Sequence, residues 1–208
     1  MELLKRSLKL VAIAAIFMSI QVNAQNYKAM QDSFASSYKY EKVYDYVKAI
    51  KSIKAVYVEN SYEANLRMGW LTYLNGNYTE SAEYYQKAIK LMPYAIEPKL
   101  GYTYPLYSLG SWDLLKKQYD DIITIDPQNT TANYKLGYIY YLKQDYAAAF
   151  KYVEKVINLY PFDYDSVLLF AYINLKLGKT NDAKVLFNKA LLNQPGDKTA
   201  LEGLNSIK

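Results

Sequence analysis

The sequence contains neither cysteine nor histidine among its 208 residues. Without cysteine the chain forms no disulfide bond, and it lacks the residue that carries the lipid anchor of a bacterial lipoprotein. Zinc, iron and copper sites lose their preferred ligands when both residue types are missing. Nucleophiles activated by a histidine base are excluded as well. Stability must therefore come from packing alone, and we predict no metal site and no cofactor.

The acidic residues do not compensate for these absences. Asp120, Asp121 and Asp126 fall at the predicted end of a helix and its turn, where solvation explains them, and Asp163 and Asp165 flank a predicted helix start, where capping explains them. Neither group has a base, a nucleophile or a phosphate-binding loop beside it in the sequence. We therefore predict no catalytic residues and no enzymatic activity.

Residues 1–24 have the pattern of a secretory signal peptide. Three basic side chains among the first nine residues precede an apolar run of 11 residues, Leu10–Ile20, and the small residues Val22 and Ala24 follow. The apolar run is shorter than the roughly 20 residues that span a bilayer comfortably. We predict export to the periplasm or beyond the cell; an uncleaved anchor is the alternative.

The charge balance argues against nucleic acid as a partner. The formal net charge is +5, and 22% of the residues are charged. Residues 1–24 carry three basic side chains and one acidic side chain, so the remainder carries +3. That charge is mild, and the lysines alternate with acidic residues along the predicted helices instead of forming a basic patch. A solvated surface is the better interpretation of these side chains.

Two sets of residues recur at a constant spacing of 34. Turn-forming positions make up the first set: Gly76, Gly110, Gln144 and Gly178. Prolines that end apolar helical segments make up the second: Pro93, Pro127, Pro161 and Pro195. A period of this length is typical of arrays of helix pairs. The sequence therefore predicts an all-α chain built from repeated helical hairpins.

The period divides residues 25–208 into successive units. The predicted units are a divergent first repeat at 25–61, four regular repeats at 62–95, 96–129, 130–163 and 164–197, and a C-terminal capping helix at 198–208. Terminal units of such arrays are expected to be atypical because one of their sides faces solvent. Within the first unit we align Tyr44 with Tyr78 and Tyr146, and expect Val43, Val47 and Ile50 to share one apolar helix face.

Each regular unit also places small and large residues at fixed positions. The recurring features are the pairs Met68-Gly69, Leu136-Gly137 and Phe170-Ala171, the aromatic residues Tyr78, Trp112 and Tyr146, and the small residues Ser81, Ala149 and Ala183. In these residues and their spacing the chain resembles the tetratricopeptide repeat family; Leu115 and Thr180 depart from its pattern. The resemblance implies a right-handed α-solenoid of antiparallel helix pairs, a superhelix of the kind formed by these repeats. It implies nothing specific about the partner.

The repeat at 96–129 departs from the others in composition. Pro105 falls within its predicted first helix, where proline removes a backbone donor and crowds the carbonyl of Gly101, four residues earlier. Thr103 and Leu115 occupy positions where the neighbouring repeats have smaller side chains. We therefore predict a kinked or splayed helix pair.

The resemblance places the first helix of each pair along a concave groove. Read at helical spacing, the positions that face this groove are Leu66, Trp70, Tyr73, Leu100, Tyr104, Tyr107, Tyr134, Tyr138, Tyr141, Leu168, Tyr172 and Leu175. The eight aromatic residues in this set, with Leu66 and Leu100, are the predicted partner-binding residues. Aromatic side chains dominate binding hot spots. Two roles stay open for Tyr73, Tyr107 and Tyr141, because each can also pack against the next helix pair.

These observations favour a non-catalytic protein–protein interaction scaffold of the cell envelope. We expect a peptide or a protein segment to bind in the tyrosine-lined groove, without nucleic acid and without stable membrane insertion after signal cleavage. One alternative is a glycan-binding module, since aromatic faces stack on sugar rings. Another is an envelope assembly adaptor that self-associates as a homo-oligomer.

Overall fold

The computed structural model describes residues 27–207, in which every regular element is an α-helix. Residues 27–42 are helical, and ten helices follow them within the described range: α2 (Tyr46–Lys54), α3 (Tyr62–Leu74), α4 (Tyr78–Leu91), α5 (Glu97–Ser108), α6 (Trp112–Ile125), α7 (Thr130–Leu142), α8 (Tyr146–Leu159), α9 (Tyr164–Lys176), α10 (Thr180–Asn193) and α11 (Lys198–Asn205). The predicted signal peptide at 1–24 lies outside the described residues. The all-α solenoid class expected from the sequence is confirmed.

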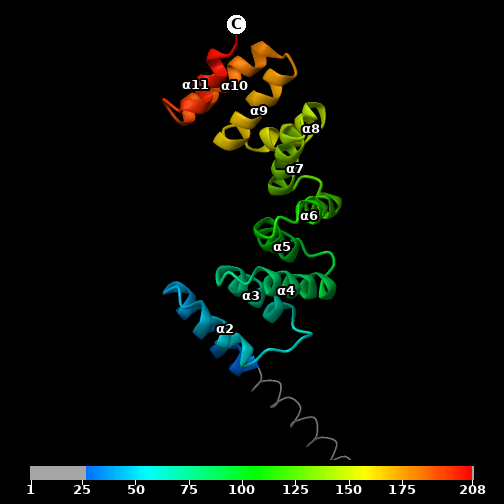
Figure 1. Cartoon of the computed structure of the whole chain (residues 1–208), viewed down its shortest axis with the longest axis vertical. Helices are drawn as coiled ribbons and strands as arrows, with labels where there is room; N and C mark the ends of the chain where they lie inside the picture. The colour runs from blue at the N-terminus through cyan, green and yellow to red at the C-terminus, as the bar shows by residue number, and fades with distance from the viewer. Residues whose placement is uncertain (1–26, 208) are drawn as a thin grey trace, which may run out of the picture. The chain divides into compact units, whose positions relative to one another are not determined.

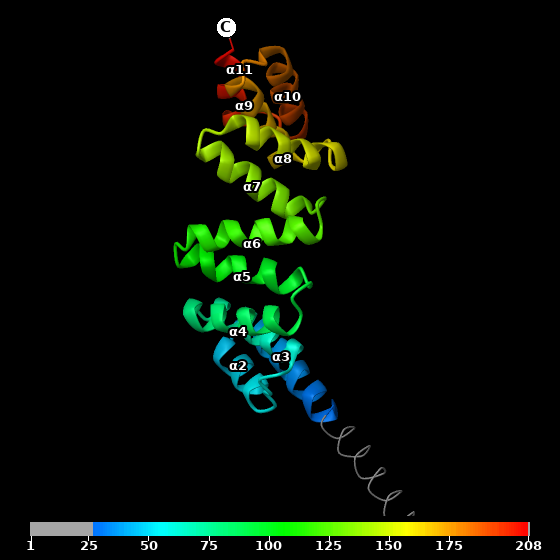
Figure 2. The same cartoon turned by 90° about the vertical axis from the view of Figure 1, so that its right-hand side faces the viewer.

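The helices form two compact units, of which the first ends at Pro93 and the second begins at Tyr94. In the first unit α2 packs against α3, and α3 lies beside α4 (Figures 1 and 2). In the second unit each helix from α5 to α11 packs against the next one along the chain. Each unit therefore buries its apolar side chains between sequence neighbours, as a helical repeat does.

Short turns at the predicted phase join the two helices of each pair. Gly76, Gly110 and Gly178 adopt positive φ angles of 81°, 66° and 74°, and Gln144 adopts 61° at the corresponding place. Glycine reaches this left-handed region without steric cost, whereas Gln144 tolerates it at some expense. The turn that follows reverses the chain, so that the second helix packs against the first.

Side-chain caps begin most of the first helices of the pairs. The side chains of Ser61, Asn129 and Asp163 accept hydrogen bonds from backbone N–H groups in the first turns of α3, α7 and α9. The caps satisfy donors that have no partner within the helix. α5 lacks such a cap and instead has Pro98 in its first turn, where a missing N–H costs nothing.

Small residues set the close approach of the helices within two pairs. Ser81 Oγ of α4 donates a hydrogen bond of 2.7 Å to the carbonyl oxygen of Gly69 in α3. A Cβ added at Gly69 would lie 2.9 Å from Cδ2 of Tyr85, and one added at Gly137 would overlap Cγ2 of Val153 in α8. Glycine at these positions therefore allows the helix backbones to pack directly against the facing side chains.

The α5–α6 pair departs from this arrangement, and one part of the expectation is wrong. α5 runs without interruption from Glu97 to Ser108, with Pro105 inside it. Gly101, whose carbonyl faces the proline ring, has no side chain to add to the crowding, so the helix continues. The two helices contact each other less extensively than the other hairpins do, however. Thr103 and Leu115, both buried, occupy the contact where glycine, serine or alanine stands elsewhere.

The predicted register of the first repeat is also wrong. Tyr44 does not begin a helix but lies in the turn with a φ of 60°, and α2 begins at Tyr46. Val43 and Val47 are exposed, while Ile50 is buried together with Ala49 and Ile53. α2 has nine residues where α4 has 14. A constant 34-residue offset therefore fails in this unit.

Candidate partner-binding surface

The most regular part of the predicted surface lies on α7. Tyr138 is 45% exposed, whereas Tyr134 and Tyr141, on the same helix, are half-buried. Burial raises the pKa of Tyr134 to about 12, helped by the nearby carboxylate of Asp165. Burial also raises the pKa of Tyr141, with further contributions from the neighbouring phenols, Tyr172 and Tyr138 among them. These tyrosines therefore remain neutral and form one cluster of hydroxyl groups at ordinary pH.

α5 presents two further tyrosines to solvent. Tyr104 is 49% exposed and stands 34 residues before Tyr138, at the same place in its repeat. Tyr107 is more exposed, and its ring meets the ring of Trp112 edge-on at a centroid distance of 5.3 Å. Leu100, one turn before Tyr104, is half-buried. The exposed tyrosines expected on this helix are therefore present.

The expectation of an exposed aromatic face is wrong for Trp70 in α3. Its ring is half-buried, and Nε1 donates a hydrogen bond of 2.7 Å to Oε1 of Glu41. Glu41 also forms an ion pair of 2.6 Å with Arg67, whose guanidinium lies 3.9 Å from the ring centroid of Tyr38. Since Glu41 and Tyr38 both belong to the helix at 27–42, that helix lies against α3 and covers Trp70. The tryptophan therefore holds the first unit together.

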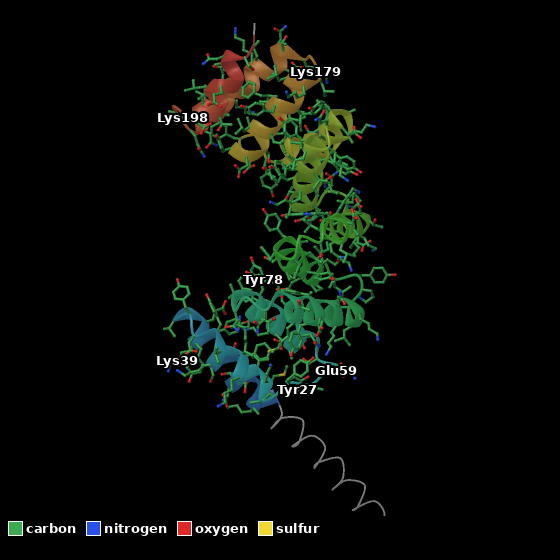
Figure 3. All side chains as sticks on the ribbon, viewed as in Figure 1. Tyr27, Lys39, Glu59, Tyr78, Lys179 and Lys198 are labelled. Atoms are coloured by element: carbon green, nitrogen blue, oxygen red, sulfur yellow. The ribbon has the colours of Figure 1, made fainter. Side chains whose placement is uncertain are left out.

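The other predicted positions in the first unit are likewise partly covered. Leu66 and Tyr73 are half-buried. The ring of Tyr73 lies 5.8 Å from that of Trp70 and 5.7 Å from that of Tyr78, the first residue of α4 (labelled in Figure 3). Tyr73 thus packs against its own hairpin, the alternative that the sequence left open.

Tyr172 in α9 is also engaged in packing. Its hydroxyl donates a hydrogen bond of 2.6 Å to the carbonyl oxygen of Thr199 in α11, and its ring meets Phe187 edge-on at 4.9 Å. Leu168 and Leu175 pack against the same apolar cluster. The exposure expected for Tyr172 is therefore wrong, because the C-terminal helix α11 packs on this side of α9.

A pocket of about 610 Å³ lies between α5, α6 and α7. It is lined by Tyr107, Trp112, Asp113, Leu115, Lys116, Tyr119, Lys135, Tyr138, Ile139, Leu142 and Lys143. Only two of these, Tyr107 and Tyr138, belong to the residues predicted from the sequence. Trp112 is 58% exposed, although Tyr78 and Tyr146 at the same repeat position are half-buried. The signal that would have identified it is the coincidence of this tryptophan with the altered packing residue Leu115.

The chemistry of the described residues is that of a binding surface. Within 27–207 no group of three or more acidic residues is placed to hold a metal ion. Nor does any helix of that part of the chain combine the length and the apolar character needed to cross a membrane. The exposed tyrosines supply apolar rings and hydroxyl hydrogen bonds, which suit the binding of another molecule.

Comparisons with known proteins place the chain among helical repeat proteins. Models of the tetratricopeptide repeat match residues 45–96 and 130–163. A relative from Bacillus subtilis (strain 168), the TPR repeat-containing protein YpiA, is 26% identical over 168 residues. The alignment covers 78% of this chain and 39% of YpiA, so the chain spans about two fifths of that relative's length.

Solved structures share the fold at low sequence identity. A tetratricopeptide repeat protein from Parabacteroides merdae is similar with a TM-score of 0.74 and 19% identity, over 86% of this chain and 72% of that one. YrrB, described as a TPR protein with an unusual peptide-binding site, is similar with a TM-score of 0.69 and 14% identity, over 86% of this chain and 97% of that one. At such identities the likeness concerns the fold.

Proposed function

Because the chain is a tetratricopeptide repeat protein, we propose that it is a non-catalytic scaffold that binds an extended protein segment along the tyrosine-bearing helices of its second unit. One observation carries the proposal. Tyr104 and Tyr138 occupy the same position of successive repeats and are 49% and 45% exposed, although the packing of their helices does not require an aromatic residue there. The partially buried Tyr134 and Tyr141 extend the same surface.

The physical case rests on what a tyrosine contributes when a partner covers it. The ring is rigid and loses little conformational entropy on binding, while the hydroxyl keeps a hydrogen bond as the apolar ring is buried. Because the tyrosines on α7 remain neutral, they attract no counter-charge. Binding to these four residues therefore depends on apolar contact and hydrogen bonding, with a weak dependence on salt.

The comparisons support a peptide or protein segment as the ligand. YrrB, whose fold is similar, is described as having a peptide-binding site. Relatives that share only the fold say nothing of which residues bind, so the tyrosines proposed here depend on the exposure of their side chains in this chain. A glycan or a second copy of the chain would use the same aromatic surface differently, and the test below separates them.

We also propose that the chain acts outside the cytoplasm, because of the signal-like pattern in residues 1–24. Expression in a bacterial host, fractionation and N-terminal sequencing test this part. Cleavage after Ala24 with recovery in the periplasm or the medium is expected, and an intact N-terminus in the cytoplasm would contradict it.

The ligand class can be tested with a displayed library of random decapeptides, a glycan array and sedimentation of the chain alone. We expect selected peptides to bind. Simultaneous replacement Tyr104→Ala and Tyr138→Ala should weaken their binding at least about 30-fold, since each buried aromatic anchor contributes more than about 1 kcal/mol. Tyr94→Ala is the matched control, because Tyr94 is 84% exposed but lies in a turn outside the helices.

Three results would overturn the proposal. The first is unchanged peptide affinity in the double variant, and the second is binding to glycans with no peptide selected. The third is a dimer in sedimentation that dissociates when Tyr104 and Tyr138 are replaced.

A further inference from the structure

The pocket between α5, α6 and α7 is formed where the repeat pattern is altered. Leu115 lines it, at the position where the neighbouring repeats have Ser81 and Ala149. In those repeats the helices approach closely enough for Ser81 to bond to the carbonyl oxygen of Gly69. In the α5–α6 pair the larger Leu115 and Thr103 take that place, and the two helices contact each other less extensively. The pocket is therefore a consequence of this repeat's own sequence.

The rim of the pocket exposes an aromatic pair. The positive φ of Gly110 turns the chain between α5 and α6 and brings Tyr107 against Trp112, with ring centroids 5.3 Å apart. Leu142 at the end of α7 is exposed as well. A volume of about 610 Å³ lies within the range of pockets that hold small ligands or a bulky side chain. A bulky apolar group entering it would remove Trp112 and Leu142 from water.

Three lysines line the pocket beside a single carboxylate, that of Asp113. Lys116 is paired with Asp120 at 2.8 Å. Lys135 and Lys143 form no ion pair with any residue in the described part of the chain. Two positive charges are thus held beside an apolar hollow without a partner of their own. A ligand with negative charge next to its apolar group would complement them.

We propose that this pocket anchors a large apolar side chain, aromatic or leucine, of an acidic segment of a partner protein, with the flanking carboxylates lying against Lys135 and Lys143. The inference rests on the proposed function, since it specifies the kind of protein segment that the scaffold takes. It adds Trp112, Leu142 and the two lysines to the binding residues, and it adds a charge preference that the four tyrosines alone do not supply.

Three pools of fluorescein-labelled decapeptides test the inference by fluorescence anisotropy. The first has a central Phe or Leu between Asp and Glu residues, the second has the same centre between Gln and Ser residues, and the third has a central Ala between Asp and Glu residues. We expect the first pool to bind at least about tenfold more tightly than either of the others. Its advantage over the second pool should shrink as salt rises from about 50 to 500 mM.

Variants of the full chain then locate the binding. Trp112→Ala and Leu142→Glu should each weaken binding of the first pool about tenfold or more, the second by placing a like charge beside the acidic peptide. Lys135→Gln with Lys143→Gln should remove the advantage of the first pool over the second and its salt dependence. Lys184→Gln with Lys198→Gln changes the net charge equally at exposed positions on α10 and α11 and should have no such effect. Circular dichroism confirms that each variant is folded.

The outcomes separate this inference from the proposed function. If the first two pools bind equally and Tyr104→Ala with Tyr138→Ala weakens both, the scaffold binds peptides but the pocket does not select acidic ones. Unchanged binding in Trp112→Ala and Leu142→Glu would also overturn the inference. A chain dimer that Trp112→Ala dissociates would assign the pocket to self-association instead. If no pool and no displayed peptide binds, both proposals fail.

Discussion

At the scale of single residues, the absence of a side chain sets the distance between helices. Gly137 of α7 faces Val153 of α8 so closely that a Cβ added to it would overlap a methyl group. The same role falls to Gly69 opposite Tyr85. Such contacts explain why glycine is found inside helices here despite its low helix propensity.

Gly137→Ala should therefore destabilise the second unit by about 1–3 kcal/mol, although alanine is the better helix former. Urea denaturation followed by circular dichroism measures the change. In a chain that already carries Val153→Ala, the added cost of Gly137→Ala should fall close to zero, because the overlapping methyl is gone. A Gly137→Ala chain as stable as the parent would show that the helices are not held at this distance.

The titration of Tyr134 provides a second test at this scale. Its pKa rises from the ordinary value of 10.0 to about 12 in the folded chain, mainly because of burial. The unfolded chain therefore loses this proton first, and stability should fall between about pH 10 and 12. Tyr134→Phe should reduce this pH-dependent loss by at most about 2 kcal/mol, as measured by denaturation at pH 9 and pH 11.5. An identical loss in both chains would contradict the burial of the phenol.

The sequence identified the exposed Tyr104 and Tyr138 but not the covered Trp70 and Tyr172. All four share one position of the repeat, so the pattern cannot separate them. The difference arises from helices outside the four regular repeats: Glu41, before α2, accepts the hydrogen bond from Trp70, and α11 accepts the one from Tyr172. A prediction from periodicity fails where a non-repeated helix covers the repeated face.

At the scale of the element, α5 shows that a proline is tolerated inside a helix when its surroundings allow it. Pro105 lies within the continuous helix Glu97–Ser108 and is buried. Its ring faces the carbonyl of Gly101, which adds no side chain of its own. The sequence indicated the strain correctly but not its outcome, because the packing of Tyr102 and Leu106, both buried, maintains the helix on either side.

Pro105→Ala should stabilise the second unit by about 1–2 kcal/mol. The substitution restores a backbone donor and removes a helix penalty of about 3 kcal/mol, and it loses about 1 kcal/mol of apolar burial. The shift in the thermal midpoint measures the balance. A lower midpoint would mean that the proline ring contributes more to packing than it costs the helix.

The register of α2 is a failure of another kind. The spacing of 34 residues holds wherever both helices of a pair have their full length, and α2 has only nine residues. A shortened helix displaces every position before it in the chain. Hydrophobic periodicity in a segment of nine residues is too brief to fix such a displacement, so the turn at Tyr44 was missed.

At the scale of the whole molecule, the chain consists of two compact units that have their own cores. The first is closed by a polar contact: Arg67, with a side chain only 6% exposed, is paired with Glu41 at 2.6 Å. Removing one partner of such a pair leaves a buried charge uncompensated. The two units therefore offer separate tests of stability.

Glu41→Ala should cost the first unit about 2–4 kcal/mol and affect the second less. Hydrogen exchange followed by mass spectrometry should show faster exchange in α3 and α4, with smaller changes in α9 and α10. Glu83→Ala, which removes an exposed carboxylate of α4, is the matched control. Equal acceleration in both units would show that they unfold as one.

The central claim is that the first helices of the second unit bind a protein segment through their exposed tyrosines. The most direct measurement is photo-cross-linking of a selected peptide that carries benzoylphenylalanine, with the attachment sites located by mass spectrometry. The account predicts cross-links on α5 and α7, around Tyr104 and Tyr138, that disappear when both tyrosines are replaced by alanine. Cross-links confined to the second helices α8 and α10, or unaffected by those substitutions, would contradict it.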